Sequence, residues 1–313
     1  MFVNIEEAAR LLQHSQPVAI PTETVWGIAA CMDDRRGIEQ IFRLKRRPRE
    51  NPLIVHISDY TALTNSCDNL PDEALTLAHT FWPGGLTLVI PVNPNRILSE
   101  VRADLPMCAF RMPNNQDTLS LINQCGPLVA PSANISGKPS ATNPQHIIDD
   151  FGQDFPILST TTSSERGIES TILIWQQGFW KMGRYGAINQ EQLEKILGYT
   201  IEPITTSQTL CPGSTFRHYA PNAQLTLCNK GWKEEDAEFF DGVLGFSDRS
   251  YPCAQTIVTM GLSTNPENVA RHLFAALREL DNRSLHTVFV DLNIIFSDKW
   301  KSIIDRLTRA AKK

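Results

Sequence analysis

IEQIFRLKRRPRENPLIVHI, residues 38–57, contains the change of periodicity on which the fold class depends. Ile38, Ile41 and Phe42 are spaced as on one face of a helix, whereas Leu53–Ile57 is a continuous apolar run of strand length. A short basic segment with two prolines joins them. The stretch therefore predicts a helix followed closely by a buried strand, the connection that α/β domains repeat.

The same alternation extends in both directions, up to about residue 199. Asn4 followed by Glu7 is typical of a helix N-cap with a capping-box partner, which opens a helix through about Leu12. We expect an α/β domain with one large mixed sheet. Its predicted strands are Pro17–Pro21, Leu53–Ile57, Leu86–Val92, Met107–Arg111, Leu128–Ala130 and Thr171–Trp175, and its further helices lie around Glu73–Phe81, Thr118–Asn123, Gln145–Phe151 and Gln190–Leu197.

A second pattern follows a polar segment. Residues 200–222 carry three prolines and many Thr and Ser residues, which predicts a linker. Within it, Arg217–Tyr219 brings two potential cations and a phenol, so we expect a loop that contacts a surface, such as a lid. The domains are therefore predicted at residues 1–199 and 223–313, with the linker between them. The second domain has predicted strands at Leu225–Leu227, Val243–Phe246, Thr256–Met260 and Thr287–Leu292 and helices at Pro266–Leu280 and Trp300–Ala311.

The composition excludes several classes of protein. The formal net charge is -5, so no global basic field draws the chain to nucleic acid or to an anionic membrane. The seven cysteines include no C-x-x-C pair, which argues against a disulfide framework and against structural zinc. We see neither the basic and apolar regions of a signal peptide nor an apolar run of about 18 residues. We expect a cytoplasmic protein without a membrane span.

Five cations fall within seven residues of this acidic chain: Arg43, Lys45, Arg46, Arg47 and Arg49. At a helix-to-strand turn such a cluster can clamp a triphosphate, with Arg giving forked contacts and Lys a mobile point charge. Two other interpretations remain open: a solvated helix C-terminus, where cations are favoured anyway, and a site for RNA phosphates. The chain has no Walker A motif, and no G-x-G-x-x-G opens a helix.

Small polar residues follow several predicted strands. Pro131–Asn134 comes after the apolar run that ends at Ala130, a place where α/β sheets put ligand contacts, and Ser140 lies on the loop just beyond. A Ser/Asn-rich turn explains the same residues. Pro21–Thr24 either binds substrate or forms a hydroxyl-capped turn. His56, within an apolar strand, has the pattern of a hydrogen-bonded core residue rather than that of a ligand.

Taken together, these motifs resemble the YrdC family in order and spacing. The matching stretches are PTETVWGIAA, LKRRPRENPLIVHI, FWPGGLTLVI, FRMP, APSANISGKPSATNP, GIEST and GRYGAI, from about residue 5 to residue 198. CPGSTFRHYAP then resembles the linker of the long, two-domain form, the threonylcarbamoyl-AMP synthases. The resemblance implies a twisted mixed sheet around a deep basic cavity, plus a small C-terminal Rossmann-like α/β domain.

The resemblance also implies a reaction. It is the synthesis of L-threonylcarbamoyladenylate from L-threonine, bicarbonate or CO2, and ATP with Mg2+, with release of pyrophosphate. The product serves the tRNA threonylcarbamoyl transferase machinery. The family signature K-x-R with S-x-N falls on Lys45, Arg47, Ser132 and Asn134, which we take as the catalytic set. The implied ATP contacts are Lys45, Arg47, Asn51, Ser132, Asn134, Ser140, Arg184 and Tyr219, and the implied threonine contacts are Thr24, His56, Arg111, Ala130 through its backbone, and Ser170.

The chain departs from the family pattern at several positions. Trp26 stands where a Tyr is usual, Arg46 replaces the glycine of K-G-R, Met107 replaces a Thr, and Ile174 replaces an Asp. Tyr185 likewise replaces the proline of R-P-G-A-I. These departures concern the detailed nucleotide contacts, because the Lys, Arg, Ser and Asn set is intact.

Two other functions share the fold: an RNA-binding module and a related carbamoyl transferase acting on another acceptor. The acidic net charge and the absence of aromatic stacking motifs argue against the first. The linker and the second domain favour the synthase over the second. Whether tRNA is contacted directly stays open, as do the oligomeric state and the role of the C-terminal domain.

Overall fold

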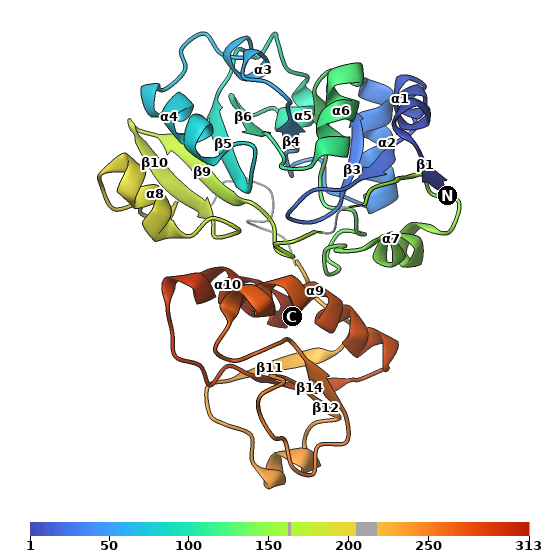
Figure 1. Ribbon diagram of the computed structural model, residues 1–313, viewed down its shortest axis with the longest axis vertical. Coiled ribbons are helices and arrows are strands. Elements are labelled where there is room, and N and C mark those ends of the chain that lie inside the picture. Colours follow the sequence, from blue (N-terminus) through green and yellow to red (C-terminus); the bar gives the residue numbers. More distant parts are fainter. Residues whose placement is uncertain (162–163, 205–217, 313) are drawn as a thin grey trace. The chain divides into compact units, whose positions relative to one another are not determined.

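The computed structural model describes residues 1–313 except 162–163, 205–217 and 313 (Figure 1). The described chain divides into two compact units. Among the described residues, no helix has both the length and the apolar composition that a membrane crossing needs. The first unit comprises Met1–Ser136, Ala141–Glu165 and the chain from Glu169 to residue 204; the second comprises Gly137–Ser140, Arg166–Ile168 and the chain from residue 218 onward.

A ten-stranded sheet with parallel and antiparallel pairs forms the centre of the first unit. It confirms the predicted α/β domain with one large mixed sheet. In spatial order the strands are β1 (Phe2–Val3), β8 (Ile157–Leu158), β2 (Val18–Ile20), β3 (Gly27–Cys31), β7 (Leu128–Val129), β4 (Ile54–His56), β6 (Met107–Arg111), β5 (Leu86–Pro91), β9 (Thr171–Gln176) and β10 (Phe179–Arg184).

Helices cover both faces of this sheet, because successive side chains of a strand point to opposite faces. In β3, Ala29 packs in the same apolar cluster as α1 and α6, whereas Ile28 packs with α2 and α4. Ile38 and Phe42, on the predicted face of α2, are buried in that second cluster. The helices are α1 (Ile5–Gln13), α2 (Arg35–Lys45), α3 (Thr61–Thr64), α4 (Asp72–Phe81), α5 (Ser99–Arg102), α6 (Gln116–Cys125), α7 (Pro144–Phe151) and α8 (Gln190–Leu197).

The first helix shows one correct and one wrong prediction. Asn4 is the N-cap, and its side chain accepts a hydrogen bond from the backbone N–H of Glu7 at 2.8 Å. The carboxylate of Glu7 does not return to the N-cap backbone as a capping box requires. It forms an ion pair with Arg10 one turn later, at 2.6 Å. The ion pair with Arg10 therefore occupies the carboxylate that the capping box would need.

The second unit is built on a four-stranded parallel sheet, which confirms the small Rossmann-like α/β domain. Helices α9 (Pro266–Asn282) and α10 (Lys301–Ala311) lie side by side on one face of the sheet (Figure 1). Val269, Leu273 and Leu277 are buried, as the amphipathic pattern of α9 predicts. In spatial order the strands are β11 (Gln224–Cys228), β14 (Thr287–Asp291), β12 (Gly242–Gly245) and β13 (Ile257–Thr259), and two short 3-10 turns are η1 (Glu234–Glu238) and η2 (Asp298–Trp300).

The predicted linker is described only at its two ends. Residues 205–217, Arg217 included, lie outside the described residues. Before them the chain runs beside β10, where the N–H of Met182 donates to the carbonyl of Glu202 at 2.8 Å. After them Tyr219 belongs to the second unit. Its ring is buried and stacks on Phe274, with 5.3 Å between the ring centroids.

Candidate functional site

Helix α2 ends at Lys45, and this residue ties the helix to the segment that follows β7. The side chain of Lys45 is only 1% exposed. Its Nζ donates to the carbonyl of Ser132 and to the carbonyl of Asn134, the latter at 2.5 Å. In return, the N–H of Ser136 donates to the carbonyl of Lys45 at 2.8 Å. The structure therefore brings together Lys45, Ser132 and Asn134, residues separated by almost ninety positions in the chain.

The five-cation cluster divides into two groups. Arg43, Arg46 and Arg49 are exposed, in keeping with a solvated helix end. Lys45 is buried and Arg47 is half-buried. Arg46 takes the left-handed C-cap conformation at φ 51°, which reverses the chain between these two inward residues. The solvated-helix interpretation thus fits the three exposed arginines, and the phosphate role of Lys45 and Arg47 stays a prediction.

Arg47 closes the loop before β4. Its Nε donates to the carbonyl of Asn51 at 3.1 Å, and its Nη2 donates to the carbonyl of Pro52 at 2.8 Å. The side chain of Asn51 is 2% exposed, and its Oδ1 has no hydrogen-bond partner among the described residues. A buried acceptor without a partner is costly, so this oxygen suits a donor brought by a ligand.

The segment after β7 is fixed by pairing with the start of β3. Gly27 forms an isolated bridge with Ser132, and the N–H of Ala133 donates to the carbonyl of Trp26 at 2.7 Å. A side chain at Gly27 would meet Cβ of Ala130 at 3.1 Å, so the glycine permits the close approach of the two chains. The N–H of Ala130 donates to the carbonyl of Ile54 at 3.1 Å, and a ligand contact at the Ala130 backbone stays a prediction.

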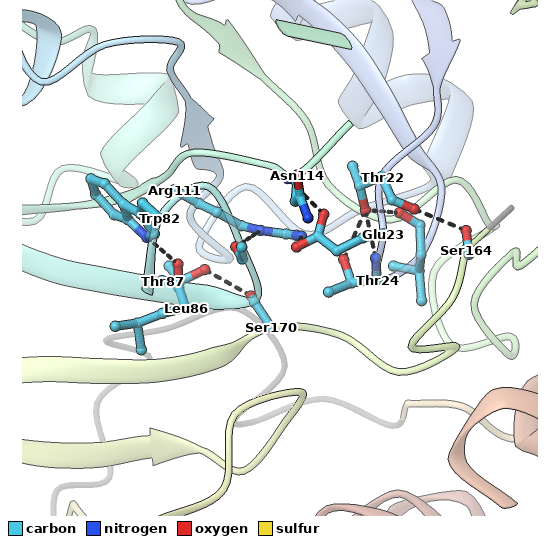
Figure 2. Close-up of polar contacts among 12 residues, drawn as sticks. Thr22, Glu23, Thr24, Trp82, Leu86, Thr87, Arg111, Asn114, Ser164 and Ser170 are labelled. Carbon is cyan, nitrogen blue, oxygen red and sulfur yellow. Dashed lines mark hydrogen bonds and ion pairs between the residues drawn. The ribbon is translucent and has the colours of Figure 1, made fainter. Parts of the chain in front are cut away.

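A second group of polar side chains surrounds Arg111 at the end of β6 (Figure 2). Its Nη2 forms a buried ion pair with Glu23 at 2.7 Å, and its Nε donates to the carbonyl of Gly84 at 3.1 Å. The other carboxylate oxygen of Glu23 accepts from the N–H of Asn114 at 3.0 Å. The guanidinium is thus held in one orientation by a carboxylate that the sequence interpretation did not single out.

Ser170 joins this region from the start of β9. Its Oγ lies 2.7 Å from Oγ1 of Thr87, and the Nη2 of Arg184 donates to the same Oγ at 3.2 Å. The Nε of Arg184 also donates to the carbonyl of Ser170, at 3.1 Å. Figure 2 shows Ser170 and Thr87 beside the Arg111 group. One expected threonine contact and one expected ATP contact therefore touch each other directly.

Thr24 lies in the turn between β2 and β3, with its side chain fully buried. Its Oγ1 is 2.8 Å from Oγ1 of Thr22, which in turn donates to the carbonyl of Val25 at 2.6 Å. Ser164 anchors the same turn by donating to the carbonyl of Thr22 at 3.1 Å. Both interpretations of this turn, substrate contact and hydroxyl-capped turn, are compatible with these bonds.

His56 is opposite Arg111 in the parallel pairing of β4 with β6. Burial, with a smaller contribution from the positive charge of Arg111, lowers the pKa of His56 to about 3. Its Nδ1 lies 3.2 Å from the carbonyl of Ile54. At neutral pH the imidazole is therefore uncharged, so its role toward a ligand is that of a neutral hydrogen-bonding group.

This neutral histidine predicts a pH dependence of stability. The unfolded chain takes up a proton at His56 below about pH 6.5, whereas the native protein does so only near pH 3. The free energy of unfolding should therefore fall as the pH is lowered between these values, by about 1.4 kcal/mol per pH unit from this group. Urea titrations at a series of pH values give the free energy of unfolding of the wild type and of His56→Gln. Plotted against pH, this free energy should fall more steeply for the wild type across the window. Parallel plots for the two proteins would contradict the burial of an uncharged His56.

The remaining expected contacts, Ser140 and Tyr219, belong to the second unit. Ser140 is buried at 1% exposure. The ring of Tyr219 is buried between Phe274 and the guanidinium of Arg306, whose Cζ lies 5.1 Å from the ring centroid. Tyr219 is thus engaged within the second unit in this structure.

Sequence reasoning missed two residues of the site, Glu23 and Thr87. Glu23 had a signal: it is an acidic residue among hydroxyl side chains in PTET, directly after an apolar strand. An acidic residue at such a place indicates a cationic partner, and Arg111 is that partner. Thr87 had none, because a Thr in the apolar strand LTLVIP fits β-propensity alone.

Comparison with known proteins adds an independent line of evidence. The family described as "Telomere recombination" (Sua5, YciO and YrdC) matches residues 10–186, and the family described as "Threonylcarbamoyl-AMP synthase, C-terminal domain" matches residues 188–312. A threonylcarbamoyl-AMP synthase of Bacillus subtilis is 34% identical over 98% of this chain and 92% of its own length. The solved structure of Pyrococcus abyssi Sua5 in complex with L-threonine has a TM-score of 0.89 at 31% identity and covers 99% of this chain and 97% of its own.

Proposed function

The chain belongs to the threonylcarbamoyl-AMP synthase family, and from that premise we propose that it makes L-threonylcarbamoyladenylate from L-threonine, bicarbonate or CO2, and ATP. The observation that carries the assignment to this site is the buried polar group around Arg111, which brings one guanidinium together with several buried hydroxyls. Such a combination suits a small zwitterion that carries a hydroxyl. The Pyrococcus abyssi relative binds L-threonine.

We place the threonine α-carboxylate on Arg111. Glu23 and the carbonyl of Gly84 hold two of its nitrogens, Nη2 and Nε, so Nη1 is the nitrogen that remains for the substrate. Thr24, His56 and Ser170 would contact the hydroxyl and amine, and the carbonyl of Ala130 would accept from the amine.

We place ATP on the Lys45 side of the unit. Lys45, Arg47 and Arg184 supply positive charge, and Ser132 and Asn134 are tied to Lys45 through their main-chain carbonyls. Asn51 adds a buried acceptor for a donor on the nucleotide. Arg184, which we assign to ATP, donates to the hydroxyl of Ser170, which we assign to threonine. This hydrogen bond therefore links the two proposed substrate regions.

The proposed chemistry needs no covalent enzyme intermediate. The amine of threonine adds to CO2 and loses a proton, which gives an N-carboxylate. One oxygen of this carboxylate attacks the α-phosphorus of ATP, the bond to the β-phosphate oxygen breaks, and pyrophosphate leaves. The protein must align two anions that repel each other and hold the charge that develops on the phosphates. Lys45, Arg47 and Arg184 suit that electrostatic task.

We propose that Mg2+ enters with ATP. Its preferred ligands are oxygens, and it commonly keeps several waters while substrate phosphates supply the rest. The described residues offer no group of three or more His, Cys, Asp and Glu side chains for a metal ion. We therefore assign no side chain to Mg2+, whose ligands would be phosphate oxygens and waters. When bound, it neutralises charge on the triphosphate.

The chemical lability of the product bears on where the enzyme works and on what takes up the product. A mixed carboxylic–phosphoric anhydride hydrolyses readily, so an enclosed site protects it. We propose that the enzyme works in the cytoplasm and passes its product to the tRNA threonylcarbamoyl transferase machinery. The buried Cys108 and the half-buried Cys228 are free thiols, which suits a reducing compartment.

An omission assay tests the reaction class. Release of pyrophosphate from ATP should require threonine and bicarbonate together. Serine should react more slowly, because a missing methyl in a fitted pocket is worth roughly 1–3 kcal/mol. Equal release from ATP alone would indicate an ordinary hydrolase and would refute the proposed function.

A further inference from the structure

Helix α9 of the second unit packs against two short loops that come from elsewhere in the sequence. These loops, Gly137–Ser140 and Arg166–Ile168, belong to the second unit, although their neighbours on both sides in the chain belong to the first. The Nη2 of Arg278 on α9 donates to the carbonyl of Pro139 at 2.7 Å, and this bond is buried. The N–H of Ala220 donates to the carbonyl of Gly137 at 2.8 Å.

The second loop meets α9 by direct backbone packing. A Cβ built on Gly167 would lie 2.3 Å from Cα and 2.6 Å from the carbonyl oxygen of Arg271. Gly167 also has φ +67°, a conformation that residues with a side chain rarely adopt. A glycine is therefore required twice over at this contact, once for the backbone angle and once for the space.

Both loops lead directly into residues assigned to the substrates. Pro139 precedes Ser140, an expected ATP contact, and Gly167 lies three positions before Ser170, an expected threonine contact. Packing holds a buried guanidinium in place, so its hydrogen bond to a main-chain carbonyl fixes the position of that carbonyl. Loss of the guanidinium would leave the carbonyl unpaired, which is costly in a buried place.

We infer that helix α9 of the C-terminal domain positions the two substrate loops, with Arg278 as the positioning residue for the ATP loop and the Gly167 contact as its counterpart for the threonine loop. The inference rests on the proposed function for the roles of Ser140 and Ser170. It gives the C-terminal domain a task in the reaction itself, since α9 belongs wholly to that domain.

The two loops can be tested independently, because each should affect the KM of a different substrate. Arg278→Met keeps an unbranched apolar stem and removes the donor, so the KM for ATP should rise about tenfold while the KM for threonine stays unchanged. Arg278→Lys restores one donor and should recover most of the loss. Gly167→Ala should raise the KM for threonine more than the KM for ATP. Arg283→Ala is the matched control, because Arg283 is an exposed arginine at the end of the same helix that pairs with Glu279.

Hydrogen–deuterium exchange of the intact protein provides a readout that does not depend on activity. The amides of Gly137, Lys138 and Ser140 should exchange faster in Arg278→Met than in the wild type and in Arg283→Ala, and Arg278→Lys should restore protection. A thermal melt of each variant identifies any general loss of folding. Unchanged exchange at 137–140 together with an unchanged KM for ATP in Arg278→Met would overturn the inference. Absence of adenylate from the wild type would instead contradict the proposed function, and exchange would still decide whether Arg278 holds the loop.

Discussion

Replacing Lys45 with methionine should lower kcat by about a hundredfold to a thousandfold, the usual cost of removing one preorganised donor from a site where charge develops. Methionine fills the space of the buried aliphatic stem but carries no ammonium. Steady-state kinetics with saturating threonine and bicarbonate measure the effect. The control is Arg43→Ala, which removes an exposed cation two positions earlier on the same helix and should leave kcat unchanged.

The same substitution should also affect the fold, because Lys45 holds the carbonyls of Ser132 and Asn134. Leaving buried polar groups unpaired costs roughly 1–3 kcal/mol each, so Lys45→Met should be less stable in a urea titration. Activity should fall far more than the folded fraction does. Wild-type kcat in Lys45→Met would remove this residue from the catalytic set.

Replacing Glu23 with alanine should destabilise the protein by about 3–5 kcal/mol, because it leaves the guanidinium of Arg111 buried without its countercharge. Urea titration at pH 7 measures the loss. Replacing Arg111 in addition should recover part of it, since the second change removes the uncompensated charge. Threonine binding should weaken in both variants, because the α-carboxylate loses an oriented partner.

An exposed ion pair supplies the control for Glu23. Arg49 pairs with Glu39 at 2.5 Å, and both side chains are largely open to solvent. Glu39→Ala should cost at most about 1 kcal/mol. Equal losses in Glu23→Ala and Glu39→Ala would show that the Glu23–Arg111 pair does not hold a buried charge, and the threonine site built around it would lose its support.

The main elements of the fold could be predicted because their signals are local. The helix that contains Ile38, Ile41 and Phe42 and the strand that contains Val55 are both recognisable from the spacing of apolar residues alone. The amphipathic pattern of α9 gave that helix to within two residues of its observed end. Each of these elements buries a face that its own sequence defines, so contacts with distant parts of the chain hardly alter its type or its bounds.

The strands that were missed depend on distant partners. β1 and β8 have two residues each and exist through the pairing of Phe2 with Ile157. β3 reads GIAAC, and its Gly and Ala residues have low β-propensity, so only its place between β2 and β7 makes it a strand. β10 pairs with β9 across a tight turn that the sequence marks only by Gly178.

The site was partly predictable for a related reason. The cluster of cations is visible in the sequence, but burial alone distinguishes Lys45 from Arg43, and burial depends on the segment at Ser132. Arg111 was named through a family resemblance, whereas its partner Glu23 follows from folding, which brings together two positions that are 88 residues apart. Side chains that act in pairs across such separations leave little trace in a single sequence.

Direct detection of the product tests the central claim. The purified protein is incubated with L-threonine, ATP, Mg2+ and 13C-labelled bicarbonate, and the mixture is analysed at once by mass spectrometry. We predict an adenylate that contains threonine and one labelled carbon, formed only when all three substrates are present, with pyrophosphate in equal amount. AMP or ADP appearing without any labelled adenylate would contradict the account.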